Sequence, residues 1–260
     1  MIKSFKADLY RLLRSKGLYI CLALTMLIYA LTIGLKADGG ISFGIMPQID
    51  GLEAKMKSMK LDVLQLRMNF NNYFLLIMPV FMIIIPEFSE GTFKNSITSV
   101  CNKKNFFIRK FVFAEVVSMI IFIVGNVGFY VVNRLLNGSV YSSSVGDFME
   151  KFVMEIPIFV AVIAFFVFLA FLFKKASVFN SVTIVLPLVI NVVAGLLCMV
   201  DGLEKTVLKA YNYEVSTMLN IFVFETEGKE FFPRCLVGAI IITIVLFLLG
   251  LSMFDKKELA

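Results

Sequence analysis

Residues 152–173 read FVMEIPIFVAVIAFFVFLAFLF and decide the fold of this chain. Glu155 is the one ionisable residue in this stretch, and the rest is almost entirely aliphatic and aromatic. A helix of about 20 consecutive apolar residues is long enough to cross the hydrocarbon core of a bilayer. The stretch is therefore predicted to be a membrane-spanning helix.

The whole chain has the same character as this stretch. Of its 260 residues, 59% are hydrophobic and only 17% are charged, with a mean hydropathy of +0.89. Soluble domains are roughly half apolar and about a quarter charged, so a water-soluble fold could not bury this much apolar surface. We expect an all-α membrane protein that forms one transmembrane domain, residues 1–260. Its six spans are predicted at about 18–35, 70–88, 111–132, 152–173, 178–200 and 236–254.

The second span is the weakest of the six. Its uninterrupted apolar run covers only residues 73–85. Pro79 and Pro86 each remove a backbone donor, which predicts a kink or a broken helix end.

The first 16 residues form a separate element. Apolar residues recur at helical spacing and basic residues fill the other positions, which predicts an amphipathic interfacial helix on an anionic membrane surface. The alternative is a solvated basic leader without fixed structure. Gly17 is expected to let the chain turn into the first span. Lys and Arg are dense beside spans one, three and five on the N-terminal side, so both termini are predicted to be cytoplasmic.

Two loops on the opposite, extracellular side carry apolar stripes. The first runs from Ile49 to Phe70 at alternating spacings of three and four. It predicts a helix on the outer membrane surface or a packing partner of the bundle. The second covers residues 207–222 and predicts a re-entrant or interfacial helix pair. Ordinary packing and a specific gate remain open for both stripes.

Several kinds of chemistry have no support in the chain. It contains no histidine, and its four cysteines show no CxxC spacing, which argues against metal and Ser-His catalysis. Cys198 and Cys235 are expected near the outer face, where they either pair or remain small buried hydrophobes. No Gly-x-x-x-x-Gly-Lys-Ser/Thr phosphate loop occurs, so ATP hydrolysis would need another polypeptide.

The segment between spans two and three carries the functional signal. Residues 87–94 read EFSEGTFK, and basic residues follow at positions 103, 104, 109 and 110. This segment resembles the cytoplasmic loop of the type-two ABC export permeases, in which an acidic-Gly-Thr-x-basic pattern precedes a short coupling helix. The matching residues are Glu90, Gly91, Thr92, Lys94, Lys103 and Lys110. Val100 and Asn102 depart from the family, which often has Pro and Ser at these places.

The charges of this segment predict a short helix within the coupling loop 89–110. Glu87 and Glu90 would complement the positive start of that helix, and Lys103 and Lys104 its other end. In the resembled family this coupling helix docks in a cleft of a separate ATPase subunit. The alternative is a solvated loop whose charges only anchor the spans.

The resemblance implies a non-catalytic permease subunit of an ATP-driven exporter in the bacterial plasma membrane. Two copies of an ABC ATPase subunit would bind ATP and Mg, and this chain would bind neither cofactor nor nucleic acid. The permease would form a homodimer, or a heterodimer with a related permease. Residues 5–17 look like permeases that export toxic amphipathic peptides or confer immunity to lantibiotics.

The spans hold few polar groups, and the candidate translocation path consists of Glu115, Asn180 and Asn191. Intramembrane charges usually mark function, although Glu115 could simply pair with Arg109 or Lys110. Glu155 could likewise pair with Lys151, four residues earlier on the helix. The scarcity of polar groups, with 28 Phe and 14 Met, suits amphipathic substrates. Alternatives are a secondary transporter or channel not coupled to an ATPase, and an intramembrane enzyme.

Overall fold

The computed structural model describes residues 2–37, 56, 58–93, 102–200, 202–224 and 228–256. Within these ranges, six helices are long and apolar enough to cross a membrane, as in a multi-pass membrane protein. They are α2 (Lys16–Leu35), α5 (Phe70–Ser89), α7 (Lys103–Tyr141), α8 (Val145–Phe173), α9 (Ala176–Cys198) and α12 (Gly228–Lys256). The predicted all-α architecture with six apolar helices is confirmed.

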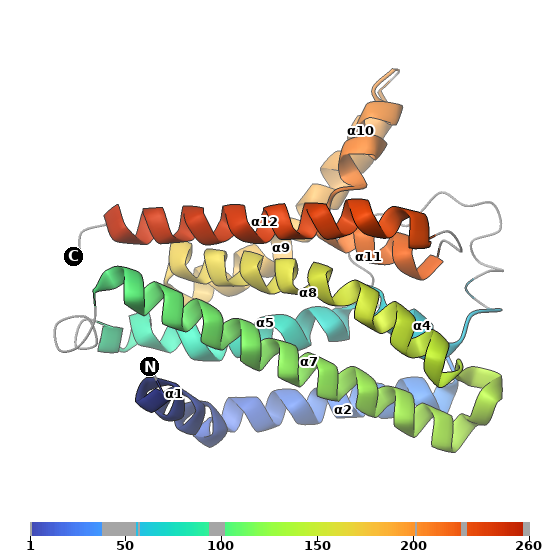
Figure 1. Cartoon of the computed structure of the whole chain (residues 1–260), viewed down its shortest axis with the longest axis horizontal. Helices are drawn as coiled ribbons and strands as arrows, with labels where there is room; N and C mark the ends of the chain where they lie inside the picture. Colours follow the sequence, from blue (N-terminus) through green and yellow to red (C-terminus); the bar gives the residue numbers. More distant parts are fainter. Residues whose placement is uncertain are drawn as a thin grey trace.

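The long helices make a bundle with two distinct ends (Figure 1). The terminal end holds α1 (Ile2–Arg14), the junction of α5 with α7, the junction of α8 with α9, and the end of α12. The far end holds α4 (Leu61–Leu66), the junction of α7 with α8, and α11 (Val215–Phe224). Helix α8 is the central member, because it packs against α5, α7, α11 and α12.

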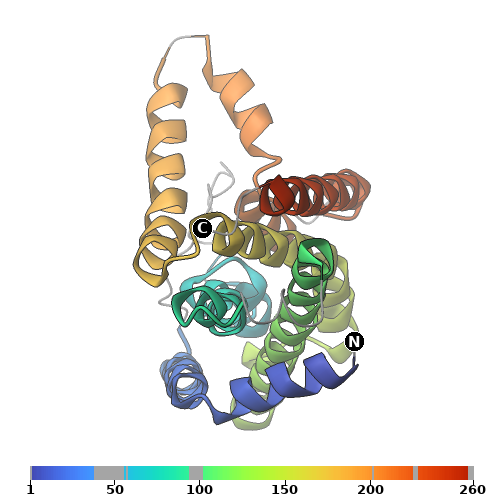
Figure 2. The same ribbon diagram turned by 90° about the vertical axis from the view of Figure 1, so that its left-hand side faces the viewer.

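Helix α1 confirms the predicted amphipathic helix at the start of the chain. Figure 2 shows α1 lying across the terminal end of the bundle, whereas α2 is seen end-on. The turn between the two falls at Ser15, which has an extended backbone, and not at Gly17 as predicted. Gly17 lies inside α2, where an added Cβ would meet Cε of Met82 at 3.0 Å. This glycine therefore allows close packing against α5 and is not the turn.

Helices α5 and α7 differ from their predicted spans. Pro79 and Pro86 both lie inside α5, and neither ends it. Helix α7 extends beyond residues 111–132 at both ends, so residues 103–110 are helical and not part of a loop. Buried aromatic side chains in its first turns hold this extension against the bundle. The helical geometry breaks at Gly138, whose φ is 66°.

Each of the two apolar stripes of the predicted extracellular loops includes a helix that packs into the bundle, and residues 49–55 of the first stripe lie outside the described residues. All six residues of α4 are buried, so it is a packing partner and not a surface helix. Helix α4 ends at Leu66. The predicted continuous stripe to Phe70 is interrupted there, because residues 67–69 are not helical. The second stripe forms the predicted pair, α10 (Glu204–Tyr211) and α11, of which α11 is buried from Ser216 to Phe224.

The disulfide between Cys198 and Cys235, one of the two alternatives predicted for these residues, does not form. Cys198 and Cys235 are both free thiols. Cys198 ends α9, whose first half packs against α5 and α8 and whose later part, with α10, stands away from the bundle (Figure 2). Cys101 lies outside the described residues.

A substitution at Gly250 tests the packing of α12 against α7. An added Cβ at this position would meet Cζ of Phe107 at 2.7 Å, whereas nothing lies within 4 Å of an added Cβ at Gly128. Gly250→Ala is expected to lower the stability of the purified protein by about 1–3 kcal/mol through overpacking. Gly128→Ala, the matched control, is expected to be neutral or stabilising by up to about 1 kcal/mol. Thermal unfolding in detergent measures both, and equal shifts would contradict this packing.

Candidate functional site

Four charged side chains meet at the terminal end of the bundle, and we call them the ion cluster: Asp8, Arg11, Glu87 and Lys110. The ammonium Nζ of Lys110 lies 2.7 Å from Oδ1 of Asp8 and 2.7 Å from Oε1 of Glu87. The guanidinium of Arg11 lies 2.8 Å from Oε1 of Glu87 and 3.7 Å from Oδ1 of Asp8. Two positive and two negative charges therefore compensate one another.

The ion cluster joins three helices, and all its members except the 36% exposed Arg11 are shielded from water. The side chains of Glu87 and Lys110 are each 6% exposed. Asp8 and Arg11 come from α1, Glu87 from the last turn of α5, and Lys110 from α7. Arg11 also donates to the backbone oxygen of Ile83 at 3.2 Å, which adds a second link between α1 and α5. A buried charge that loses its partner costs several kcal/mol, so these helices must keep their relative positions.

The start of the predicted coupling loop is attached directly to the ion cluster. Thr92 Oγ1 donates to Oε2 of Glu87 at 2.9 Å. Glu90 is the C-cap residue of α5, and its N–H donates to the backbone oxygen of Pro86 at 2.9 Å. Gly91 follows with a φ of 68°, a left-handed conformation that glycine adopts without strain and that ends helices. The chain thus leaves α5 in a defined direction.

The structure places the charges of this segment in part differently from the sequence prediction. Glu87 and Glu90 lie at the C-terminal end of α5, where a helix disfavours negative charge. The cations of the ion cluster offset this cost at Glu87. Thr92 and Phe93, directly after Gly91, are again helical, and the predicted short helix beyond them stays a prediction. Lys103 and Lys104 begin α7 and do not end a short helix; Lys104 pairs with Asp255 at 3.4 Å. Lys94 and most of the predicted coupling helix lie outside the described residues.

Aromatic side chains pack beside the ion cluster and connect α5, α7, α8 and α12. Phe93, at the start of the coupling loop, lies 5.1 Å from the ring of Phe88. The Phe88 ring contacts that of Phe171 at 5.6 Å, and Phe107 contacts Phe171 at 4.6 Å. Phe254 of α12 completes the group at 5.2 Å from Phe171. Such pairs contribute about 0.5–1.5 kcal/mol each beyond the area they bury.

The two carboxylates inside the spans have no hydrogen-bond partner among the described residues. Lys110 pairs with Asp8 and Glu87 in the ion cluster, and no hydrogen bond from a described residue reaches the buried oxygens of Glu115. Glu155 is fully buried, and within the described ranges neither of its oxygens has a hydrogen-bond partner. Lys151, four residues earlier, acts electrostatically on this carboxylate, but no hydrogen bond joins the two. Both residues remain candidates for function, because an intramembrane carboxylate is costly.

Asn180 and Asn191, the other members of the candidate translocation path, lie on α9. Asn180 is exposed, and its backbone oxygen accepts from Oγ1 of Thr183 at 3.2 Å. Figure 2 shows α5 and α8 between α9 and α7, the helix that carries Glu115. No observation brings these residues together, and a path through them stays a prediction.

Sequence reasoning missed a second polar network at the far end. The carboxylate of Asp62 on α4 accepts from the backbone N–H of Ser143 at 3.0 Å and also from its hydroxyl. Asn72 Nδ2 donates to the backbone oxygens of Gln65 at 2.6 Å and Arg67 at 3.0 Å. These bonds satisfy the backbone around the end of α4. Buried non-helical backbone in a membrane protein requires such partners.

The ion cluster was also missed, although the chain carries a signal for half of it. Asp8 is the one acidic residue in the basic opening segment, and it stands three positions before Arg11. That spacing places both side chains on one face of a helix. Their contact with Glu87 and Lys110 depends on how α1 crosses the bundle, which no local pattern specifies.

Comparison with known proteins does not identify a family or a function for this chain. No protein-family model and no curated protein matches the chain.

Removal of Lys110 tests the ion cluster. Lys110→Met would leave Asp8 and Glu87 with only the partly exposed Arg11, so we expect a loss of about 3–5 kcal/mol of stability. The matched control is Lys104→Met. The Lys104–Asp255 pair is 54% and 39% exposed, so this change is expected to cost less than about 1 kcal/mol. Thermal unfolding in detergent compares the stabilities of the two variants. Similar losses of stability would show that the ion cluster stabilises the protein no more than an exposed ion pair does.

Proposed function

We propose that this chain is the membrane-spanning permease subunit of an ATP-driven ABC exporter that moves amphipathic or hydrophobic substrates, namely peptides of the toxin or lantibiotic class, outward. The observation that carries the proposal is the ion cluster together with Thr92. It fixes both ends of the segment that resembles the coupling loop, because Glu87 precedes that segment and Lys110 follows it. A displacement of this segment would therefore move α1, α5 and α7 together.

This arrangement supports coupling to a separate motor protein. A loop that only linked two spans would need no buried charges at its base, since buried ion pairs contribute little net stability over apolar packing. A rigid base is useful when force must pass from a soluble partner into the bundle. The partner we propose is an ABC ATPase subunit in two copies, which would bind ATP and Mg.

The remaining parts of the proposal follow from the surface and the resemblance. The chain would act as a homodimer, or as a heterodimer with a related permease, in a bacterial plasma membrane with its terminal end in the cytoplasm. The spans are rich in Phe and poor in polar groups, which favours amphipathic substrates over ions. Secretion of a peptide and protection against one are both compatible with this chemistry.

Glu90 offers a direct test of ATPase docking. It is exposed at the start of the segment and lies outside the ion cluster. Where a neighbouring gene encodes an ABC ATPase and the two proteins are co-expressed, Glu90→Lys is expected to lower substrate-stimulated ATP hydrolysis about tenfold through charge reversal at the contact. Glu150→Lys, an exposed change at the far end, is the control and should leave hydrolysis unchanged. Unchanged hydrolysis in the Glu90 variant, or failure of the ATPase to co-purify, would contradict the proposal.

A second candidate function is supported by Glu115 and Glu155. Buried carboxylates without hydrogen-bond partners among the described residues suit a transporter that binds and releases protons within its spans. In this alternative the chain is a secondary transporter or channel that works without an ATPase.

Proteoliposomes that contain this chain alone distinguish the two candidates. The secondary transporter predicts proton uptake under an imposed membrane potential, read by an internal pH dye, and its loss in Glu115→Gln or Glu155→Gln. The exporter predicts no uptake by the wild-type chain without its ATPase. Uptake that both variants retain would exclude these carboxylates as the proton carriers.

A further inference from the structure

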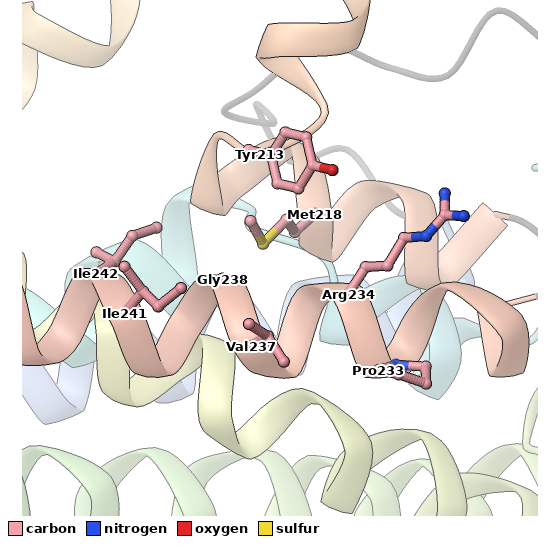
Figure 3. Close-up of a pocket in the computed structure, with 8 residues that line it drawn as sticks. All are labelled: Tyr213, Met218, Pro233, Arg234, Val237, Gly238, Ile241 and Ile242. Atoms are coloured by element: carbon pink, nitrogen blue, oxygen red, sulfur yellow. The ribbon is translucent and has the colours of Figure 1, made fainter.

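An apolar groove lies at the far end, between α12 and the turn that joins α10 to α11. It has a volume of about 600 Å³ and is lined by Tyr213, Met218, Arg234, Val237, Gly238 and Ile241, among others. Figure 3 shows Tyr213 and Met218 on one side of the groove and the α12 residues on the other. Gly238 lets the two sides approach, since an added Cβ there would meet Cε of Met218 at 3.2 Å.

The groove is open to the lipid-facing surface of the bundle. Val237 and Ile241 are more than half exposed, and most of the span on α12 faces outward. The later part of α9 and helix α10 stand away from the bundle beside it (Figures 1 and 2). In a membrane, apolar matter must fill this space, because water in an apolar groove would lack hydrogen-bond partners.

The polar groups of the groove lie at one end only. Arg234 is the third residue of the apolar span Phe232–Asp255, so its guanidinium is at the boundary of the membrane. It is exposed, and no ion pair or hydrogen bond to it is formed by the residues that the structure describes. Tyr213 is also exposed, and Figure 3 shows the Arg234 side chain rising toward the same side as the Tyr213 ring. Ile241 and Ile242 lie deeper along α12.

The size of the groove identifies the kind of occupant. Its volume falls within the roughly 300–1,000 Å³ typical of small-molecule sites. A groove of this size accommodates an acyl chain, and the exposed guanidinium of Arg234 at its end complements an anionic head group.

We propose that this groove binds an anionic phospholipid of the far-end leaflet. The acyl chain lies along Val237 and Ile241, and the phosphate accepts hydrogen bonds from Arg234 and from the hydroxyl of Tyr213. Arginine suits this role, because its planar fork donates two parallel hydrogen bonds to a phosphate. The lipid closes the apolar space between α12 and the α10–α11 turn. This site is independent of the proposed transport activity and requires only that the chain spans a membrane.

Native mass spectrometry of the full chain in detergent tests the site with two probes, phosphatidylglycerol and phosphatidylcholine of identical acyl chains. We expect phosphatidylglycerol to bind about tenfold more tightly. Arg234→Gln should remove this preference, and Val237→Trp, which fills the groove, should weaken both lipids. Lys209→Gln removes an exposed far-end charge outside the groove and should leave binding unchanged.

Other outcomes would overturn the proposal. Equal affinities of the wild-type chain for the two lipids would show that Arg234 does not recognise the anionic head group. A preference for phosphatidylglycerol that survives Arg234→Gln would show the same. Competition by free glycerol phosphate at the same concentration as the lipid would mean that only a phosphate is bound and the groove is not used. A dimer that Val237→Trp dissociates without loss of bound lipid would assign the groove to a second copy.

Discussion

The ammonium group of Lys110 holds two carboxylates at one end of the bundle, where the protein excludes nearly all water from these atoms. A lysine in this position is stable only while Asp8 and Glu87 stay within hydrogen-bond distance, each at 2.7 Å. Separation would leave charges in a low-dielectric interior at a cost of several kcal/mol. The positions of α1, α5 and α7 at the terminal end all follow from this requirement. The course of the chain after α5 follows as well, because Thr92 bonds to the same carboxylate.

The polar and charged groups at the two ends of the bundle find their partners in different ways. At the terminal end, charges pair with charges and aromatic rings surround them. At the far end, the short helix α4 enters the bundle, and neutral side chains such as Asn72 satisfy its backbone. Between these ends, the helices present mainly apolar side chains. This division agrees with a membrane, in which backbone groups away from water need internal partners. Among the described residues, the carboxylates of Glu115 and Glu155 depart from it, because they are buried without a hydrogen-bond partner.

The six spans could be predicted from the sequence, because the apolar runs are long and a bilayer requires about 20 such residues. Helix α1 was also predictable from its periodicity. The extension of α7 back to Lys103 was not, since it depends on Phe106 and Phe107 packing against α8 and α12. For the same reason Glu87 could be named as a candidate site residue, but its contacts with Arg11 and Lys110 could not be predicted. Its contacts lie far away in the sequence, and they arise from the crossing of three helices.

A double-mutant cycle between Glu87 and Lys110 tests the central claim most directly. Stabilities of the wild type, Glu87→Gln, Lys110→Met and the double variant would be measured by unfolding in the same detergent. A shared buried pair predicts a coupling energy of at least about 1 kcal/mol, because the second change removes a charge already left without its partner. Changes that add to within about 0.5 kcal/mol would show that the two residues act independently. That result would contradict the account of the ion cluster as the base of the coupling loop.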